Sequence, residues 1–205
     1  MNYRSLSCPI RLFHTIHRVD GMGGESSIQN LAVAVIVGSD SDLAVMARTV
    51  EVLKEFGVAH EVQVLSAHRT PQQLEEYIAS FGRRGVKVVI AAAGAAAHLA
   101  GKIASATTLP VIAVPLDAGG LGGLDALLST VQMPCGVPVL TVAIGNAGAT
   151  NAALAAIEIL ALNRPELSKK LAAHRKRMSD DVVRKNVELQ ELGVEEYVRK
   201  KGSSR

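Results

Sequence analysis

Six consecutive residues, Ser66-Ala67-His68-Arg69-Thr70-Pro71, bring a hydroxyl, an imidazole and a guanidinium together in one short segment. An imidazole can both donate and accept a proton near neutral pH, and a guanidinium is suited to binding anions. The apolar residues before the segment predict a strand. Thr70 and Pro71 are typical of a helix start, with Gln73 completing a capping box. In an open α/β sheet such a junction lies at the ligand-binding edge, so the segment indicates proton chemistry on an anionic substrate.

A second polar loop, Gly38-Ser39-Asp40-Ser41-Asp42, lies between the first predicted strand and its helix. Backbone N–H groups at a helix start, together with two hydroxyls, suit a phosphate. A carboxylate suits ribose hydroxyls better, because like charges repel. The alternative is that Ser41 or Asp42 only caps the helix. The loop has neither the Gly-x-Gly-x-x-Gly pattern nor the lysine of a P-loop, so neither a dinucleotide nor ATP is indicated.

Further candidates follow later strands. His98 comes shortly after Gly94 in an alanine-rich stretch. It is either a substrate contact or a helix-start histidine bonded to backbone. The glycines in 119–123 and 145–148 indicate close backbone approach, mobile lids or ordinary turns. Cys135 is expected to be a turn residue rather than a nucleophile, because no histidine lies near it in the sequence.

Apolar runs of strand length alternate with helical patterns from Leu31 onwards. The expected strands span residues 31–37, 58–65, 86–91, 111–115 and 137–144. The expected helices span 43–56, 71–84, a stretch carrying His98, a stretch from about 124, and 152–162. This alternation predicts an α/β fold with a doubly wound parallel sheet. Nearly all the polar and glycine candidates follow strands, which places them on one edge.

The chain is expected to form one main domain with two extensions. Residues 31–162 form the catalytic α/β domain, and residues 163–205 a helical tail starting near Pro165. The tail's apolar stripe packs either on its own domain or on a neighbouring subunit; its members are Leu167, Leu171, Met178 and Val182. Residues 1–30 are expected to be a disordered extension. An organelle-targeting segment, or translation starting at Met22, is the alternative.

Composition excludes several classes of function. The tail holds twelve basic and seven acidic residues, and the chain has three Tyr, three Phe and no Trp. It therefore offers no aromatic platform for nucleic-acid bases. No apolar run approaches the roughly 20 residues of a membrane span. The two cysteines form neither a disulfide framework nor a metal-ligand pattern, so no metal site is expected and a reducing compartment, the cytoplasm, is favoured.

Five segments together resemble the class I N5-carboxyaminoimidazole ribonucleotide mutases, between about Val33 and Leu162. Two of them are the loops at 38–42 and 66–71. The others are Gly94-Ala95-Ala96-Ala97-His98-Leu99, the stretch from Asp125 through Ser129 to Pro134, and the stretch from Ala143 to Leu154. The resemblance implies a flavodoxin-like three-layer fold, a homo-octamer and no metal or organic cofactor. It implies transfer of a carboxylate from N5 to C4 of the imidazole ribonucleotide in IMP and purine biosynthesis, with a separate ATP-dependent synthetase supplying the substrate.

The resemblance also implies residue roles. Ser39, Ser41 and Arg69 would hold the phosphate and Asp42 the ribose. His68 would be the catalytic acid and base. His98, as a second catalytic histidine, and the region of Gly94 would lie against the carboxylate or carbon dioxide. The other expected substrate-binding positions are Gly38, Ser66, Ala67, Ala97 and Leu99.

Some positions depart from the family pattern. Ala92 and Ala95 stand where glycines are usual, and Ala100 where a proline is common. Ala118 and Gly122 replace serines of the loop after the fourth strand. The added methyl groups would narrow the pocket, and the missing hydroxyls would leave only backbone donors in that loop.

Alternative functions remain at this point. The related carbon dioxide-dependent carboxylases of class II carry Lys in place of Arg69 and have no counterpart of His98, so this chain resembles class I. The carboxylase-like domain of nickel-pincer cofactor synthesis lacks the Ser-Ala-His-Arg loop. A non-enzymatic nucleotide-binding α/β module is the remaining alternative. A receiver would need an aspartate near Ala91-Ala92-Ala93, and a flavodoxin would need aromatic side chains in the loops.

Overall fold

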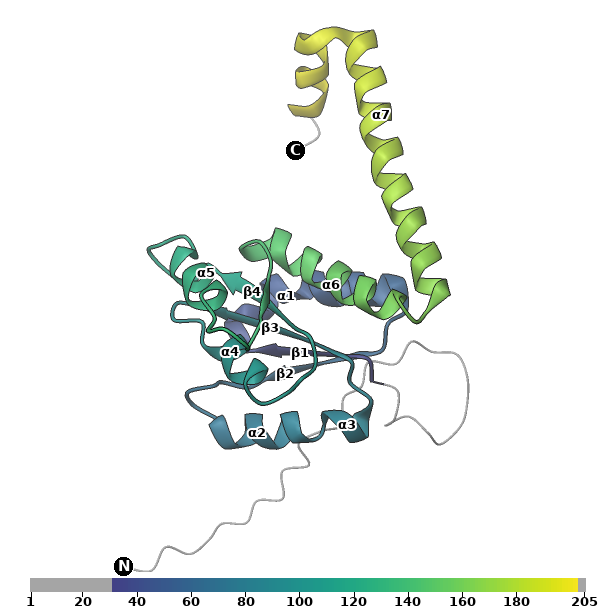
Figure 1. Ribbon diagram of the computed structural model, residues 1–205. Coiled ribbons are helices and arrows are strands. Elements are labelled where there is room, and N and C mark those ends of the chain that lie inside the picture. Colours follow the sequence, from purple (N-terminus) through teal and green to yellow (C-terminus); the bar gives the residue numbers. More distant parts are fainter. Residues whose placement is uncertain (1–30, 203–205) are drawn as a thin grey trace, which may run out of the picture. The chain divides into compact units, whose positions relative to one another are not determined.

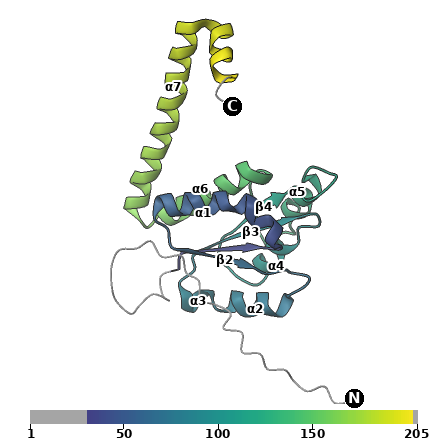
Figure 2. The same ribbon diagram turned by 180° about the vertical axis from the view of Figure 1, so that it is seen from behind.

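The fold is built on one sheet of five parallel strands. The computed structural model describes residues 31–202, and Figures 1 and 2 show it from opposite sides. The strands lie in the order β2-β1-β3-β4-β5. They are β1 (Val33–Val37), β2 (His60–Val64), β3 (Val88–Gly94), β4 (Val111–Leu116) and β5 (Leu140–Thr141). This is the predicted doubly wound arrangement, in which the chain leaves β1 toward one edge and later builds toward the other.

Helices cover both faces of the sheet and complete a three-layer α/β fold. Helices α1 (Leu43–Phe56) and α6 (Gly145–Ala161) lie side by side over one face (Figures 1 and 2). The opposite face packs against α2 (Pro71–Ala79), α3 (Phe81–Arg84) and α4 (Leu99–Ala104) in one buried apolar cluster. The remaining helices are the 3-10 turn η1 (Asp40–Asp42), α5 (Leu124–Val131) and α7 (Pro165–Gly202).

The central strands explain the alanine- and valine-rich composition. Every residue of β1 is fully buried, and β4 is buried along its whole length. Parallel strands covered on both faces need apolar side chains throughout rather than an alternating pattern. The first helix also follows from the sequence. It spans Leu43–Phe56 as predicted and ends where Gly57 adopts a left-handed conformation at φ 72°.

Two boundaries differ from the sequence prediction in the first half of the chain. The third strand begins at Val88 and runs on to Gly94, so it carries the chain three residues further toward the site than expected. The helix predicted over 71–84 is two helices, α2 and α3, which meet at Ser80. The Ser80 hydroxyl donates a hydrogen bond of 2.6 Å to the Tyr77 carbonyl. A serine bonded to local backbone favours such a helix end.

The prediction was wrong at the last strand and the helix after it. Strand β5 has two residues instead of the eight predicted. Pro138 lies just before it and has no N–H to give to the ladder. Helix α6 already begins at Gly145, so the glycines at 145–148 form its first turn and not a lid. A Cβ placed on Gly148 would lie 1.6 Å from the Ala143 carbonyl oxygen, so glycine there permits a close approach of two backbones.

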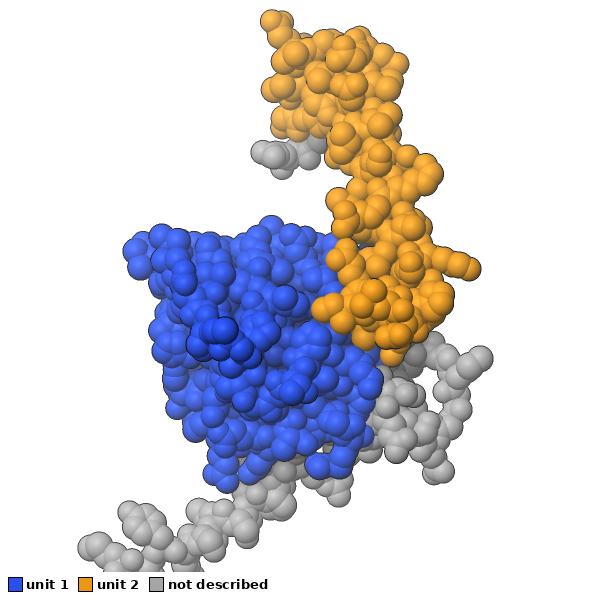
Figure 3. Space-filling view, viewed as in Figure 1, with its two compact units in different colours: residues 1–157 blue, residues 158–205 orange. Residues whose placement is uncertain are grey.

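The chain divides into two compact units, residues 1–157 and 158–205, coloured separately in Figure 3. Within the second unit, α7 starts at Pro165 as predicted. Its helical conformation is interrupted at Gly193, which has φ 74° and ψ 164°. The Glu188 carboxylate pairs with Lys200 across this interruption at 2.6 Å. On the predicted stripe, Met178 and Val182 are 55% and 66% exposed.

Residues 1–30, for which a disordered or targeting extension was predicted, lie outside the described residues. Within residues 31–202, none of the helices is both long enough and apolar enough to span a membrane.

Candidate active site

A cavity of about 310 Å³ opens at the carboxyl-terminal edge of the sheet. The loops after β1, β2 and β3 and the start of α4 supply most of its walls, as expected for an open parallel sheet. Its lining residues are Gly38, Ser39, Ser41, Asp42, Ser66, Ala67, His68, Arg69, Ala93, Gly94, Ala96, His98, Leu99 and Ala118. Eleven of the twelve predicted site residues thus surround one cavity. The exception is Ala97, a buried residue of the loop between β3 and α4 that does not line the cavity.

The loop after β1 holds its hydroxyls close together. The Ser41 Oγ lies 3.0 Å from the Ser39 Oγ, and the Ser39 hydroxyl donates a hydrogen bond to the Asp40 carboxylate at 3.1 Å. The Ser39 N–H donates to Asp42 Oδ2 at 3.1 Å, so the Asp42 side chain bonds back to the N-cap residue of η1. Asp42 is also the N-cap residue of α1, as the capping alternative predicted, but its side chain makes no capping bond to that helix. This position does not remove Asp42 from the cavity wall, because the same residue also lines the cavity.

Asp42 is the partly buried carboxylate of this loop. Burial raises the pKa of its carboxyl above the ordinary value of 3.8. The hydrogen bond from the Ser39 N–H and the positive charge of Arg69 partly oppose that rise. Burial disfavours the charged form of any carboxyl, and nearby donors and cations favour it. Holding an ionised carboxylate here therefore has a cost in stability, as is common at binding sites.

The turn after β2 is closed by its own side chains. Thr70 Oγ1 accepts a hydrogen bond from the Ser66 N–H at 2.8 Å and donates one to the Ser66 carbonyl at 3.1 Å. The Arg69 N–H donates to Ser66 Oγ at 3.2 Å. Thr70 is the N-cap residue of α2, as predicted, but its side chain makes no capping bond to the helix. The capping box with Gln73 was therefore wrong, because the hydroxyl is used to close the turn that carries His68 and Arg69.

The two histidines of the site contact each other directly. His68 Nε2 lies 2.9 Å from His98 Nδ1, within hydrogen-bond distance. Their ring centroids are 5.1 Å apart and the rings are nearly perpendicular, at 86°. His98 is the N-cap residue of α4. Its side chain makes no capping bond to the backbone, so that alternative holds only for its position at the helix start. Its side chain lines the cavity, and contact with a substrate stays a prediction.

The loop between β3 and α4 is tightly built. Gly94 lies so close to the loop after β4 that a Cβ on it would be 2.3 Å from the Ala118 Cβ. Ala95 has φ 53°, a left-handed conformation that is costly for alanine. The usual glycine would fit this backbone without strain. The Ala97 N–H donates to Ser129 Oγ at 3.0 Å, which ties the loop to α5.

Sequence reasoning missed some members of this site. Ala93 and Ala96 line the cavity but carry no chemical signal beyond their place after a strand. Ala118 was noted only as a departure from the family pattern. Ser129 was quoted in a motif without a role, and the structure places its hydroxyl against the loop that precedes His98.

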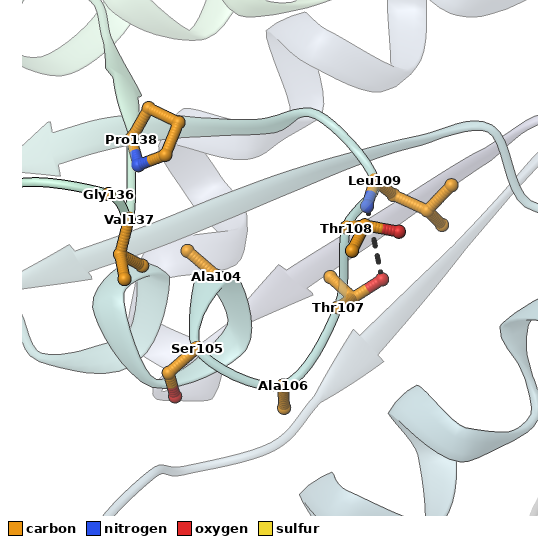
Figure 4. A pocket seen from close by; sticks show the side chains of 9 residues that line it. All are labelled: Ala104, Ser105, Ala106, Thr107, Thr108, Leu109, Gly136, Val137 and Pro138. Carbon is orange, nitrogen blue, oxygen red and sulfur yellow. Dashed lines mark hydrogen bonds between the residues drawn. The ribbon is translucent and has the colours of Figure 1, made fainter.

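A larger pocket of about 830 Å³ lies near segments that precede β4 and β5, at the opposite edge of the sheet (Figure 4). The nine described residues that line it are alanines, serine, threonines, leucine, glycine, valine and proline. None of these nine can donate or accept a proton near neutral pH. Size alone would favour this pocket as the active site. The smaller cavity is the better candidate, because its lining includes side chains that can transfer protons and bind anions. Among residues 31–202 no group of three His, Cys, Asp or Glu side chains is arranged to hold a metal ion.

Comparison with known proteins agrees with the geometry. The family model described as AIR carboxylase matches residues 32–181. The N5-carboxyaminoimidazole ribonucleotide mutase of Thermotoga maritima is 48% identical over 169 residues, which cover 82% of this chain and 98% of that protein. The protein of the same name from Pyrococcus horikoshii is 52% identical and covers 81% and 93%. That from Aquifex aeolicus is 59% identical over 139 residues, covering 68% and 82%.

Solved structures give the same fold. The crystal structure of Treponema denticola PurE matches with a TM-score of 0.70 and 24% identity, covering 77% of this chain and 98% of that one. At this identity the likeness shows the fold alone. The family model and the curated relatives show that the chain belongs to the AIR carboxylase family.

Proposed function

We propose that this enzyme is an N5-carboxyaminoimidazole ribonucleotide mutase of purine biosynthesis. It would move the carboxylate from the exocyclic N5 to ring carbon C4 without ATP. The names of relatives at 48–59% identity support this assignment. The observation that carries it is one cavity holding two touching histidines, an arginine and a hydroxyl-rich loop. Proton donors and an anion site are what the reaction requires.

The nucleotide would bind across the two loops after β1 and β2. The hydroxyls of Ser39 and Ser41 and the guanidinium of Arg69 would hold the phosphate, since charge-assisted hydrogen bonds to phosphate are strong. Asp42 would accept hydrogen bonds from the ribose hydroxyls. A smaller hollow of about 270 Å³ beside the cavity shares Ser39 and Arg69 with it and adds polar residues such as Thr70. This hollow extends the polar surface that is available to the phosphate group of the nucleotide. Backbone groups of Gly38, Ser66 and Ala67, and the side of Leu99, would complete the contacts.

His68 would supply the acid and the base. N5 must gain a proton as its bond to the carboxyl carbon breaks, which releases carbon dioxide. C4 then attacks the carbon dioxide, and the proton on C4 must leave. A group that gives a proton first and takes one back last returns to its starting state. Arg69 cannot release its proton, and an ionised Asp42 has no proton to give, so the imidazole suits both steps. His98 and the loop at Gly94 would lie against the carboxylate or carbon dioxide.

An assay with purified full-length protein tests the proposal. Conversion of the N5-carboxy substrate is followed in the absence of ATP and biotin. A parallel reaction offers the decarboxylated nucleotide with bicarbonate, which a carbon dioxide-dependent carboxylase would use. We expect the first reaction to be much faster at matched nucleotide concentration. Faster carboxylation in the second reaction would assign the alternative activity. Binding of the nucleotide with neither reaction would indicate a non-enzymatic module.

We further propose a cytoplasmic homo-octamer in the pathway to IMP, supplied by a separate ATP-dependent synthetase. The exposed apolar side chains of Met178 and Val182 support an association of copies, since exposed apolar patches often mark interfaces. Light scattering at micromolar concentration is expected to give a species much larger than a dimer. A monomer under those conditions would contradict the assembly but not the reaction.

A further inference from the structure

The loop between β3 and α4 is bonded to a hydroxyl group of the neighbouring helix, that of Ser129 on α5. We propose that Ser129 is a positioning residue, which holds this loop in the shape that the carboxyl transfer requires. This role rests on the proposed function, because the loop is the wall against which the carboxylate or carbon dioxide would lie. Ser129 is not among the described residues that line the cavity, so it would act through the loop and not on the substrate.

The Ser129 hydroxyl lies between helix and loop. Its Oγ lies 2.8 Å from the Asp125 carbonyl oxygen and 3.2 Å from that of Ala126, both in α5. It lies 3.0 Å from the Ala97 nitrogen in the loop. A hydroxyl has one proton to donate and lone pairs with which to accept. Donation to the helix carbonyls leaves a lone pair for the Ala97 N–H, so one side chain bonds to both segments.

The bond to Ser129 lies where the loop needs support. Ala97 is 3% exposed, and a buried N–H without an acceptor is costly, so the hydroxyl satisfies a group that water does not reach. Ala95 has the left-handed φ of 53°, and its carbonyl oxygen lies 3.5 Å from Ser129 Oγ. A strained backbone persists only where its surroundings fix it. Ser129 contacts the peptide groups on both sides of Ala96, which lines the cavity.

Helix α5 is a firm support for this bond. It packs on β4 and β3, with Ala126 and Thr130 buried at 0% and 3% exposure. The chain after α5 also packs on α4, because a Cβ placed on Gly101 would lie 3.3 Å from the Met133 Sδ. A well-packed helix can fix the backbone of a loop more precisely than the loop can by itself. The position of the cavity wall is therefore set in part from α5.

The braced loop and the nucleotide-binding loops occupy different walls of the cavity. Gly94, Ala96 and His98 line the cavity from the braced loop. The phosphate and the ribose would bind to the loops after β1 and β2, whereas the bonds of Ser129 described above go to α5 and to the braced loop. Loosening that loop is therefore expected to misplace the reacting carboxyl group and to leave nucleotide binding intact. A misplacement of about 1 Å can lower a rate about 10²-fold.

Steady-state kinetics on four proteins test this role. Ser129→Ala removes the hydroxyl and keeps the helix, since alanine favours helices. Its kcat is expected to fall about tenfold or more, while KM changes less than about threefold. Ser129→Thr keeps a hydroxyl and is expected to retain kcat within about threefold of wild type. Thr130→Val is the matched control and is expected to keep wild-type kcat. It removes the next hydroxyl of α5, which bonds to the Ala126 carbonyl of its own helix at 2.6 Å.

Two kinetic outcomes would overturn the role of Ser129. The first is a kcat of Ser129→Ala within about threefold of wild type, whether or not KM rises. The second is an equal loss of kcat in Ser129→Ala and Ser129→Thr. Circular dichroism and thermal unfolding verify that each variant folds. If Ser129→Ala does not fold, Ser129→Cys takes its place and is judged by the same criteria, because a thiol is only a weak acceptor.

Calorimetric titration with the decarboxylated nucleotide separates positioning from binding. This nucleotide keeps the phosphate and the ribose and lacks the carboxyl group. Its Kd is expected to agree within about threefold between wild type and Ser129→Ala. A Kd that weakened as much as kcat fell would show that Ser129 supports nucleotide binding as a whole, which would overturn a role specific to the carboxyl transfer.

Hydrogen–deuterium exchange of the full-length protein gives a readout independent of turnover. Peptides covering residues 94–99 are expected to exchange faster in Ser129→Ala than in wild type and Thr130→Val, because the Ala97 N–H loses its acceptor. Unchanged exchange would overturn the role of Ser129. If wild type catalyses the carbon dioxide-dependent carboxylation instead, the kinetic criteria apply to that reaction. Faster exchange in Ser129→Ala with no activity in wild type would contradict the proposed function, so the two failures are distinguishable.

Discussion

Arg69 joins two loops that lie 31 residues apart: its Nη2 donates a hydrogen bond of 2.7 Å to the Gly38 carbonyl. The guanidinium is therefore held in place before any ligand binds. One of its edges is used by the protein, and its other donors remain for an anion, because the guanidinium carries five N–H groups in a fixed fork. The contact links the turn of His68 to the hydroxyl-rich loop.

Arg69→Ala is expected to raise KM much more than it lowers kcat or stability. Hydrogen bonds to a charged group contribute about 1.5–3 kcal/mol, which corresponds to roughly 10- to 150-fold in KM. Steady-state kinetics on the purified variant measure the effect. Arg69→Lys is the matched control, since it keeps the charge and loses the fork, and an intermediate KM is expected. A KM within twofold of wild type in the alanine variant would remove Arg69 from the phosphate site.

Asp42→Asn is expected to raise thermal stability at pH 7 and to weaken nucleotide binding. Burial raises the pKa of Asp42 in the folded protein. A group with a raised folded pKa contributes its stability below its ordinary pKa near 4 and loses it as pH rises through the folded value. At neutral pH the ionised carboxylate therefore destabilises the fold, and the neutral amide does not.

Unfolding temperatures of wild type and Asp42→Asn at pH 7 and near pH 4 measure this difference. The stability gained by the variant is expected to shrink as the pH falls, because the wild-type carboxyl becomes protonated. Isothermal titration with the nucleotide monophosphate measures binding. An equal gap at both pH values would show that ionisation of Asp42 is not its cause.

Ala95→Gly is expected to stabilise the protein. Alanine at φ 53° costs on the order of 1–3 kcal/mol. Glycine removes that strain and adds about 0.4–1 kcal/mol of unfolded-chain entropy, so a net gain of about 1 kcal/mol is expected. Ala96→Gly is the matched control in the same loop. Its φ is not positive, so it should only destabilise. Urea unfolding measures the free energy of unfolding of both variants. An equal loss of stability in the two variants would show that Ala95 is not strained.

Glu61, Tyr77 and Arg84 form a buried polar cluster, which leads to a separate prediction about stability. The Tyr77 hydroxyl donates to Glu61 Oε1 at 2.5 Å, and Arg84 Nη2 donates to Glu61 Oε2 at 2.6 Å. Tyr77 and Glu61 are 0% and 1% exposed. Tyr77→Phe is expected to cost about 1–3 kcal/mol, since it leaves a buried acceptor with one fewer donor. Glu61→Gln is expected to cost about 3–5 kcal/mol, because Arg84 then loses its buried partner charge.

The same cluster predicts a stability loss at high pH. Burial, together with the charge of Glu61, raises the pKa of the Tyr77 phenol above its usual value of 10. The stability linked to this group is complete below pH 10 and is lost as the pH rises toward the folded value. Denaturant unfolding between pH 8 and 11 is expected to show a steeper loss for wild type than for Tyr77→Phe. If stability fell equally with pH in wild type and in Tyr77→Phe, ionisation of Tyr77 would not be the cause of the loss.

Metal removal is expected to leave activity intact. The proposed proton steps use imidazole groups and need no Lewis acid. Full mutase activity is expected after exhaustive treatment with EDTA followed by gel filtration. Activity that disappears with chelation and returns with one divalent cation would contradict a metal-independent mechanism.

Local sequence signals were sufficient for the elements with clear ends. The helix over 43–56 follows from its apolar spacing and from Gly57 at its end, and the strand starting at Val111 follows from its buried apolar run. The site edge was predictable too, because polar residues follow strands in a parallel sheet.

The errors arose where distant contacts decide the local structure. The start of α6 depends on Gly148 packing against the Ala143 backbone, and the Ala149 carbonyl accepts a bond of 2.7 Å from Thr49, 100 residues earlier. The contact of His68 with His98 likewise depends on β2 and β3 flanking β1. The spacing of residues in the sequence does not reveal that these two strands lie on either side of β1. The turn of Thr70 was misjudged because a hydroxyl can bond either to the following helix or to the preceding turn.

The shortness of β5 affects how copies of this protein behave at high concentration. It pairs with β4 through only two residues, and Pro138 just before it brings no N–H. An edge with so few free backbone groups is a poor template for a strand from another chain. This end of the sheet is thereby protected against edge-to-edge aggregation, and contacts between copies are directed toward helices and loops.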